Sequence, residues 1–394
     1  MSPGIVQTAE RLARDKLAPR APRYDREAAN PIESWRDLHA ESLLACAVPA
    51  SHGGLGLDMP DYVEVIRALA RGCASTAMTL HMHSTVMRFI DALGTDAQKR
   101  RYFAEVVQGG RLFGSWGSEP AVSLSRTFLM ETAIRADGDG WVVDGVKHFC
   151  TMALGASTYM VWCALDGEAD MGKALALALV PADAAGLASD GKWDTLGMRG
   201  TYSPSVTFTG VRISGDALLG RPGTATQVGI VESFGLGYAA VYVGLAETAL
   251  EFALDYAKKR VVRPENVPVA HDPTVQRHLG GLLVHLDAAR LVLRDAAGRW
   301  GPARSVRAAP TILIVDDDPE ARTLLAELLE VEGATVVQAA DGEAALEGLA
   351  ATEKDILEDP ATGDWCRATR TAPSRRMERS GVRRRLDGVA VATA

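Results

Sequence analysis

The stretch that decides the fold, residues 111–151, begins RLFGSWGSEP and continues as ETAIRADGDGWVVDGVKHFCT from residue 131. Two segments with β-type character, Glu131–Ala136 and Trp141–Val146, flank the sequence Asp-Gly-Asp-Gly. Glycine reaches the positive φ values that tight hairpin turns require, so this stretch predicts a β-hairpin.

Helical patterns lie on both sides of this β-rich stretch. Residues 1–110 and residues 225–299 carry apolar side chains at helical spacing, whereas residues 111–224 contain further short strands separated by Gly, Pro and Asp. Strands and helices in separate blocks favour distinct all-α and β units over a doubly wound sheet. We therefore expect a multidomain α+β protein with an all-α N-terminal domain, a β-barrel or sandwich-like middle domain and a C-terminal helical bundle.

The composition is that of a globular protein rather than a membrane or nucleic-acid-binding one. Of its 394 residues 47% are hydrophobic and 23% are charged, and the net charge of −8 argues against nucleic acid as a partner. No apolar run is long enough to cross a bilayer. The five cysteines form no Cys-x-x-Cys pair, which fits a reducing compartment. We expect a cytoplasmic protein.

The pattern changes after residue 299. Residues 300–310 read as a linker, and residues 311–357 alternate strand and helix, beginning with the fully apolar strand Thr311–Val315. Residues 358–394 form an Arg-rich tail. Its last 35 residues hold eight arginines, three acidic residues and little apolar periodicity, so we expect this tail to be disordered.

Several motifs before residue 300 resemble those of the acyl-CoA dehydrogenase superfamily of flavoproteins. They stand in the order of that family and include VPASHGGLGL, LGTDAQKRRYFAEVVQGGRLFGSWGSEP, GDGWVVDGVKHFCT, DTLGMRG and GLAETALEFALDYAKKR. The resemblance implies FAD as cofactor, an acyl-CoA or related small-molecule substrate, and a homo-oligomer.

The resemblance also implies which residues hold the flavin. A flavin needs hydrogen-bond donors at the ring edge where negative charge gathers after hydride arrival, and hydroxyl groups at two motif positions could supply them. Phe149 could pack on the ring. Arg260 matches the family arginine that helps hold the FAD phosphates, commonly across a subunit boundary. The cofactor-binding candidates are Trp116, Ser118, Phe149, Thr151 and Arg260.

Two departures from the family pattern bear on catalysis. The Gly-Ser-Asp that usually touches the acyl-CoA is replaced by Ser123-Leu124-Ser125. The glutamate that removes the substrate α-proton is expected on C-terminal helices that the resemblance does not reach after Trp300, so the bundle reads as truncated. A family subset places this base near Phe234. The candidate there, Glu232, is two residues away, about 200° around a helix, and a solvated carboxylate is the better interpretation.

Residues 311–357 resemble the first half of a response-regulator receiver domain, an incomplete α/β (flavodoxin-like) segment. In such domains, acids after the first strand bind Mg²⁺ beside a phosphoacceptor aspartate. The matching metal ligands are Asp316 and Asp317. Asp359 falls one residue short of the acceptor position, and Pro360 ends that strand.

Four functional hypotheses follow. The first is an acyl-CoA dehydrogenase-type oxidoreductase acting on CH–CH groups. Loss of the C-terminal helices that carry the base would leave it inactive. The second is a flavin monooxygenase of the same fold, which needs no carboxylate base. The third is a phosphorelay protein acting through the receiver segment, and the fourth is a non-functional fusion product. Residues 225–299 read as a helical hairpin whose apolar seam two helices leave half covered. This exposed seam predicts self-association and weak or absent retention of FAD.

Overall fold

The computed structural model describes residues 3–120, 129–264, 266–300, 311–315, 319, 323, 335–340 and 389–393. The chain divides into two compact units. The first unit comprises Met1–Leu279 with Ala289–Ser305, and the second comprises Gly280–Ala288 with Val306–Ala394. Within the described residues, no helix is long and apolar enough to span a membrane.

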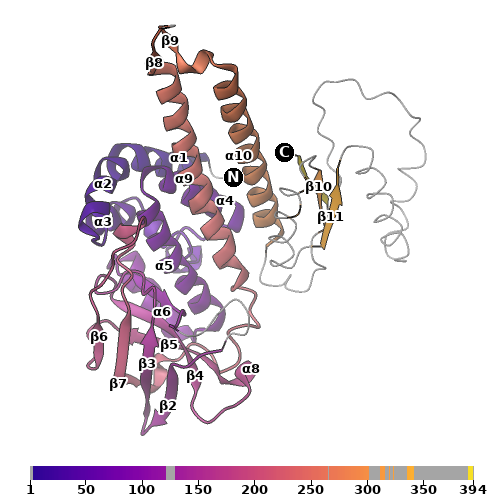
Figure 1. The fold of residues 1–394 in the computed structure, drawn as a ribbon. Coiled ribbons are helices and arrows are strands. Elements are labelled where there is room, and N and C mark those ends of the chain that lie inside the picture. Colours follow the sequence, from indigo (N-terminus) through magenta and orange to yellow (C-terminus); the bar gives the residue numbers. More distant parts are fainter. Residues whose placement is uncertain are drawn as a thin grey trace. The chain divides into compact units, whose positions relative to one another are not determined.

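The expected N-terminal helical domain is confirmed. Its α-helices are α1 (Pro3–Leu12), α2 (Ala18–Glu27), α3 (Ile32–Ala40), α4 (Met59–Gly72), α5 (Ala74–Leu93) and α6 (Asp96–Val107), with a π-helical turn η1 (Ala13–Leu17) and 3₁₀ turns η2 (Leu43–Ala45) and η3 (Ala50–His52). Thr95 caps α6 in a capping box with Gln98, as its place after Gly94 predicts. Helix α5 is buried along almost its whole length and forms the centre of this domain (Figure 1).

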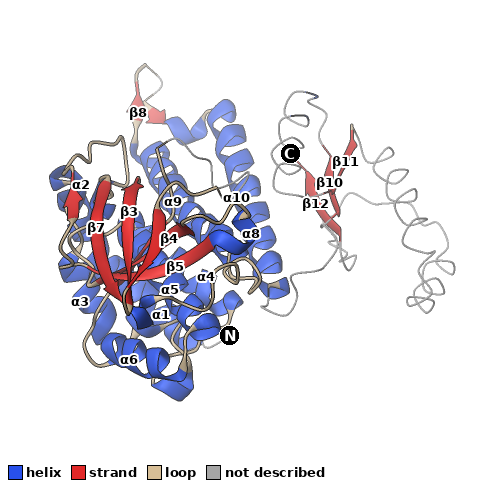
Figure 2. Ribbon diagram, turned by 90° about the horizontal axis from the view of Figure 1, so that it is seen from below, coloured by secondary structure: helices blue, strands red, loops and turns tan. Residues whose placement is uncertain are grey.

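The expected β middle domain is confirmed, and its strands form one seven-stranded sheet. Its strands are β1 (Phe113–Trp116), β2 (Ala133–Asp137), β3 (Gly140–Lys147), β4 (Thr158–Leu165), β5 (Leu175–Pro181), β6 (Leu187–Ser189) and β7 (Val206–Ser214), with the short elements α8 (Met171–Ala174), η4 (Arg199–Thr201) and η5 (Gly215–Ala217). The order is β1-β4-β2-β3-β7-β6, and β5 also pairs with β4 (Figure 2). The predicted hairpin is β2–β3, and Gly138 in its turn has a φ of +63°.

A bulge interrupts the pairing of β3 with β7. Val143 lies opposite Val211, but Gly145 lies opposite Phe208, so β7 advances by one residue more than β3. Thr209 and Gly210 are consecutively exposed there, and the backbone N–H of Gly210 donates to Asp144. The bulge therefore lets both halves of β7 turn their apolar side chains into the core.

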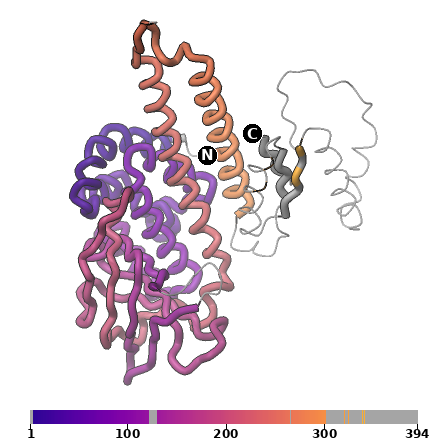
Figure 3. Tube along the Cα trace, viewed as in Figure 1, coloured from indigo at the N-terminus to yellow at the C-terminus, as the bar shows by residue number. Residues whose placement is uncertain are grey.

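Two long helices follow the sheet, α9 (Glu232–Lys259) and α10 (Pro273–Arg299), joined through β8 (Val261–Val262), β9 (Val267–Pro268) and η6 (Val269–His271) (Figure 3). Helix α9 crosses α5 closely at Gly237, where an added Cβ would lie 2.0 Å from the His81 ring. The Nε2 atom of His81 lies 3.1 Å from the Phe234 carbonyl, and its Nδ1 lies 2.9 Å from the Tyr62 hydroxyl. Burial lowers the pKa of His81 to about 3, so this histidine is neutral and structural.

A buried carboxylate joins the helices of the first unit. Glu247 on α9 is 1% exposed and forms ion pairs with Arg67 at 2.7 Å, Arg71 at 3.3 Å and Arg290 at 2.6 Å. Arg67 and Arg71 belong to α4, and Arg290 belongs to α10. One side chain therefore holds three helices through charge-assisted bonds.

The second unit contains a three-stranded parallel sheet in the order β11-β10-β12. The predicted strands appear as β10 (Thr311–Val315) and β11 (Thr335–Ala339). The third strand, β12 (Val389–Thr393), lies within the tail that was expected to be disordered, because its alternating Val and Ala residues can extend the sheet. The metal candidates Asp316 and Asp317 and the acceptor candidate Asp359 lie outside the described residues.

Replacing Glu247 by Ala is expected to lower the free energy of unfolding by about 2–3 kcal/mol, because three partly buried arginines lose the carboxylate that they share. Urea unfolding followed by circular dichroism measures the change. Glu251→Ala is the matched control. Glu251, which is more than half exposed, pairs with Arg71 from the next turn of α9, and its loss should cost about 1 kcal/mol or less. Equal losses for the two variants would contradict the central role of Glu247.

Candidate flavin site in the middle domain

Three of the five sequence-predicted cofactor residues lie together where β3 ends. The N–H of His148 donates to the carbonyl of Ser118 at 2.8 Å, and the N–H of Thr151 donates to the carbonyl of Phe149 at 2.8 Å. Phe149 is 63% exposed and has a φ of +52°. This left-handed backbone conformation is uncommon for a bulky residue, and here it accompanies an aromatic ring held at the surface.

The hydroxyl of Ser118 is available for a ligand. Ser118 is half-buried, and its Oγ forms no hydrogen bond with any of the residues that the structure describes. Its two neighbours are tightly held by Lys147, whose Nζ donates to the Gly117 carbonyl at 3.2 Å and to the Glu119 carboxylate at 2.6 Å. A fixed backbone therefore presents an unpaired hydroxyl.

The Lys147–Glu119 pair is fully buried, with side-chain exposures of 0% and 1%. The second oxygen of Glu119 accepts the N–H of Glu131 at 2.6 Å, while the first also accepts the N–H of Thr132 at 2.9 Å. Burial alone would raise the pKa of Glu119, but the Lys147 charge and these donors hold the pKa below its usual 4.5. Burial lowers the pKa of Lys147, although Glu119 opposes that change.

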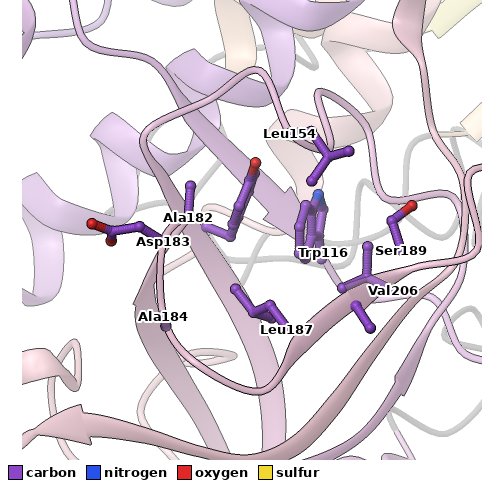
Figure 4. Close-up of a pocket in the computed structure, with 10 residues that line it drawn as sticks. Trp116, Leu154, Ala182, Asp183, Ala184, Leu187, Ser189 and Val206 are labelled. Carbon is purple, nitrogen blue, oxygen red and sulfur yellow. The ribbon is translucent and has the colours of Figure 1, made fainter.

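Trp116 faces the core rather than the open side of this site. It is 1% exposed, stacks on Tyr159 with ring centroids 3.7 Å apart, and donates its indole N–H to the carbonyl of Thr151 at 2.9 Å. Its geometry suits support of the Thr151 backbone. Trp116 and Leu154 line a pocket of about 240 Å³ (Figure 4), and Ser118, Phe149 and Thr151 are not among the residues that line it.

Arg260 lies far from the other candidates. It is the exposed C-cap of α9, whereas Phe234 at the start of the same helix packs near Trp162 of β4, with ring centroids 6.4 Å apart. Twenty-six residues of helix separate Phe234 from Arg260, a rise of about 39 Å. Figure 1 shows the two ends of α9 accordingly, one at the sheet and the other beside β8. One chain therefore does not bring Arg260 to the Thr151 region.

The carboxylate candidate Glu232 is exposed in the first turn of α9, as its solvated interpretation predicts. The helix start is surrounded instead by aromatic rings. Phe234 lies within 6.5 Å, between ring centroids, of each of four others: His81, Phe89, Trp162 and Tyr238. Among the described residues, no three His, Cys, Asp or Glu side chains form a metal site.

The segment that supports Thr151 was not predicted from the sequence. Residues 201–205 read Thr-Tyr-Ser-Pro-Ser, and their alternate hydroxyls face the end of β3: Ser203 donates to Thr151 at 3.1 Å, and Ser205 lies 2.6 Å from His148 Nδ1. The backbone adds bonds from the N–H of Cys150 to Pro204 and from the N–H of Met152 to Thr201. A hydroxyl residue at every second position, Thr201, Ser203 and Ser205, was the available signal.

These features fit a flavin ring. Ser118 and Thr151 supply hydroxyls and Phe149 an exposed aromatic face. The indole N–H of Trp193 is buried and has no hydrogen-bond partner, and its ring meets Phe149 edge-on at 6.2 Å. A planar, hydrogen-bonding ring is the class of ligand that such a set suits.

Comparison with known proteins gives one consistent family. Models of the acyl-CoA dehydrogenase N-terminal, middle and C-terminal domains match residues 4–110, 114–211 and 236–347. The third match extends beyond residue 300, where the sequence motifs stop. It spans the predicted linker and the strands β10 and β11, which the sequence analysis assigned to a receiver segment.

The similar proteins include two kinds of enzyme. The human mitochondrial short-chain specific acyl-CoA dehydrogenase is 31% identical over 296 residues, covering 74% of this chain and 71% of that protein. A dibenzothiophene monooxygenase of Rhodococcus erythropolis is 29% identical, with 74% and 72% covered.

Solved structures show the same two kinds. Butyryl-CoA dehydrogenase from Megasphaera elsdenii has a TM-score of 0.68 at 24% identity, covering 75% of this chain and 79% of that one. FMN-bound TdsC from Paenibacillus sp. A11-2 has a TM-score of 0.67 at 27% identity, with 75% and 76% covered.

The buried pair predicts a pH dependence of stability. Because the pKa of Glu119 is lower in the folded state, its contribution is present above about pH 4.5 and is lost as the pH falls through the folded value. The range to examine is about pH 3 to 6, on either side of the ordinary carboxyl value. Urea unfolding in this range should show a steeper acid loss for the native chain than for Glu119→Gln/Lys147→Met. Parallel profiles would show that Glu119 titrates alike in both states.

Proposed function

Because the chain belongs to the acyl-CoA dehydrogenase family, we propose that it is a flavin-dependent oxidoreductase whose flavin contacts Ser118, Phe149 and Thr151. The observation that carries the proposal is the unpaired Ser118 hydroxyl beside the exposed Phe149 ring, on a backbone fixed by the buried Lys147–Glu119 pair. When bound, the flavin would take up a hydride from a substrate.

The residues of the chain would bind and orient the ring. Thr151 and Ser118 would donate hydrogen bonds to its polar edge, and the Phe149 side chain would cover one face. Lys147 itself is fully buried and bonded within the protein, so it would act on the site only by holding Gly117 and Glu119 on either side of Ser118.

The first candidate reaction is the α,β-dehydrogenation of an acyl thioester. The 31% identity to a short-chain acyl-CoA dehydrogenase supports it. This reaction needs a carboxylate to remove a proton from the substrate α-carbon. Glu232, the candidate on α9, is exposed in the first turn of the helix and so is poorly placed for that role. A base for this reaction would therefore come from another part of the chain.

The second candidate is oxygenation of an aromatic substrate by a flavin monooxygenase. This reaction needs no carboxylate base, which agrees with the exposed position of Glu232 in the first turn of α9. The similarity to dibenzothiophene monooxygenase and TdsC supports the same reaction class.

A signalling role for the second unit is a separate proposal. Its strand order β11-β10-β12 corresponds to the 2-1-3 order of flavodoxin-like sheets, which favours it. The acyl-CoA dehydrogenase C-terminal domain model matches this region as far as residue 347. Acetyl phosphate labelling tests the role, and absence of labelled aspartate would remove it.

Flavin titration tests the binding site. We expect Ser118→Ala and Thr151→Val each to weaken flavin binding by about threefold to tenfold, the worth of one hydrogen bond. Thr207→Val, which removes an exposed hydroxyl on β7, is the matched control and should leave affinity unchanged. FMN and FAD should bind alike to the monomer, because Arg260 is remote. Quenching of flavin fluorescence measures the affinity of the native chain and of the three variants. Failure of the native chain to bind either flavin would contradict the proposal.

Two assays separate the candidate reactions. Anaerobic addition of a short-chain acyl-CoA should bleach the flavin absorbance of a dehydrogenase. A monooxygenase should instead oxygenate an indole or thiophene when a flavin reductase and NADH supply reducing equivalents. Given the exposed position of Glu232, we expect the second assay to succeed and the first to fail. Bleaching of the flavin by acyl-CoA would instead favour the dehydrogenase over the monooxygenase.

A further inference from the structure

Thr151 is the end of a chain of hydroxyl groups that runs from the surface into the protein. Ser203 Oγ donates to Thr151 Oγ1 at 3.1 Å, Ser203 Oγ lies 2.8 Å from Thr201 Oγ1, and Thr201 Oγ1 donates to the Met198 carbonyl at 2.8 Å. Ser203 and Thr201 are each only 3% exposed. Thr151 is half-buried and forms the accessible end.

The hydrogens of this chain can be counted. Three hydroxyls carry three hydrogens, while four gaps need one each: Met198 to Thr201, Thr201 to Ser203, Ser203 to Thr151, and Thr151 to a ligand. If the ligand accepts from Thr151, one gap inside the protein stays without a hydrogen. If the ligand donates to Thr151, every gap is filled and all three hydroxyls point toward Met198.

The alternative partner of Thr151 is poor. Its hydroxyl reaches the Phe149 carbonyl only at 3.5 Å, beyond the usual hydrogen-bond distance. The Thr151 hydrogen therefore depends on Ser203 whenever the ligand does not take it. An unmade O–H bond at a half-buried site costs free energy, so the direction of the chain has consequences for the ligand.

We propose that Ser203 is a positioning residue that lets the Thr151 hydroxyl reverse from donor to acceptor, and that the chain thereby favours the reduced form of a bound flavin. The proposal rests on the flavin site proposed above. An oxidised flavin accepts a hydrogen bond at the ring nitrogen that gains a hydrogen on reduction, after which this position donates. Reversal needs only rotation of the Thr151 and Ser203 O–H bonds, because Thr201 already donates to Met198, so no proton leaves the chain and no covalent bond changes.

The sequence of residues 201–205 provides this arrangement. Thr201 ends the 3₁₀ turn η4, and Tyr202 has a φ of +36°, so this segment is a turn that directs its hydroxyls to different partners. Thr201 and Ser203 build the chain to Thr151, whereas Ser205 lies beside His148. Ser205 therefore offers a matched control from the same segment with a hydroxyl outside the chain.

The test is the midpoint potential of the bound flavin, measured by anaerobic reductive titration against a reference dye. Ser203→Ala should bind reduced relative to oxidised flavin about threefold to tenfold less well than the native chain, which lowers the potential by about 15–30 mV for a two-electron couple. Ser203→Thr retains the hydroxyl and should restore the native value. Ser205→Ala should not change it.

Further variants isolate the route. In a Thr151→Val background, Ser203→Ala should no longer shift the potential, because the effect passes through Thr151. Thr201→Val breaks the chain one link further in and should lower the potential less, which keeps the test usable where Ser203→Ala fails to fold.

The outcomes separate the two proposals. A native chain that binds neither FMN nor FAD overturns the flavin site and this inference together. A native chain that binds flavin, with Ser203→Ala and Ser205→Ala at the same potential, overturns only the role of Ser203.

Discussion

The burial of one ion pair is the constraint on which the candidate site depends. Lys147 and Glu119 have left water completely, and such a pair is tolerated only when every donor and acceptor is satisfied. Each contact that satisfies it also fixes a piece of backbone: Gly117 on one side of Ser118, and Glu131 with Thr132 at the start of β2. Satisfying the buried charges therefore fixes the backbone on which Ser118 is presented.

The helical part of the first unit follows the same rule with a different arrangement. Glu247 is a single buried anion among three arginines, which bring α4, α9 and α10 to one point. Where α9 meets α5, the direct bridge is a neutral side chain. A neutral His81 bridges Tyr62 and the start of α9 instead. Charged anchors therefore lie along the middle of α9, while its first turn, next to the sheet, is held by neutral groups and aromatic rings.

The sequence predicted what periodicity and turn chemistry control. The helical blocks, the β2–β3 hairpin and the cap at Thr95 follow from local patterns, and the motif resemblance led to Ser118, Phe149 and Thr151. Partners distant in sequence could not be predicted in this way. Lys147 looks like an exposed strand residue until Glu119 is placed beside it, and Ser203 looks like part of a polar loop. Strand β12 was not predicted, because its five residues stand within an arginine-rich tail and are too few to give a clear strand pattern.

The bulge in β7 has a consequence for how the strand can vary. Its inward residues, Val206 and Phe208 and then Val211 and Ile213, follow two alternations that are out of phase with each other, and the extra residue near Gly210 corrects the phase. Removing Gly210 alone would leave a single unbroken alternation, so both halves of the strand could face the core in regular pairing with β3 and without a bulge. A one-residue deletion anywhere else in β7 would turn the residues on one side of it to the opposite face. The bulge is therefore the point of this strand where the loss of one residue keeps every apolar side chain directed inward.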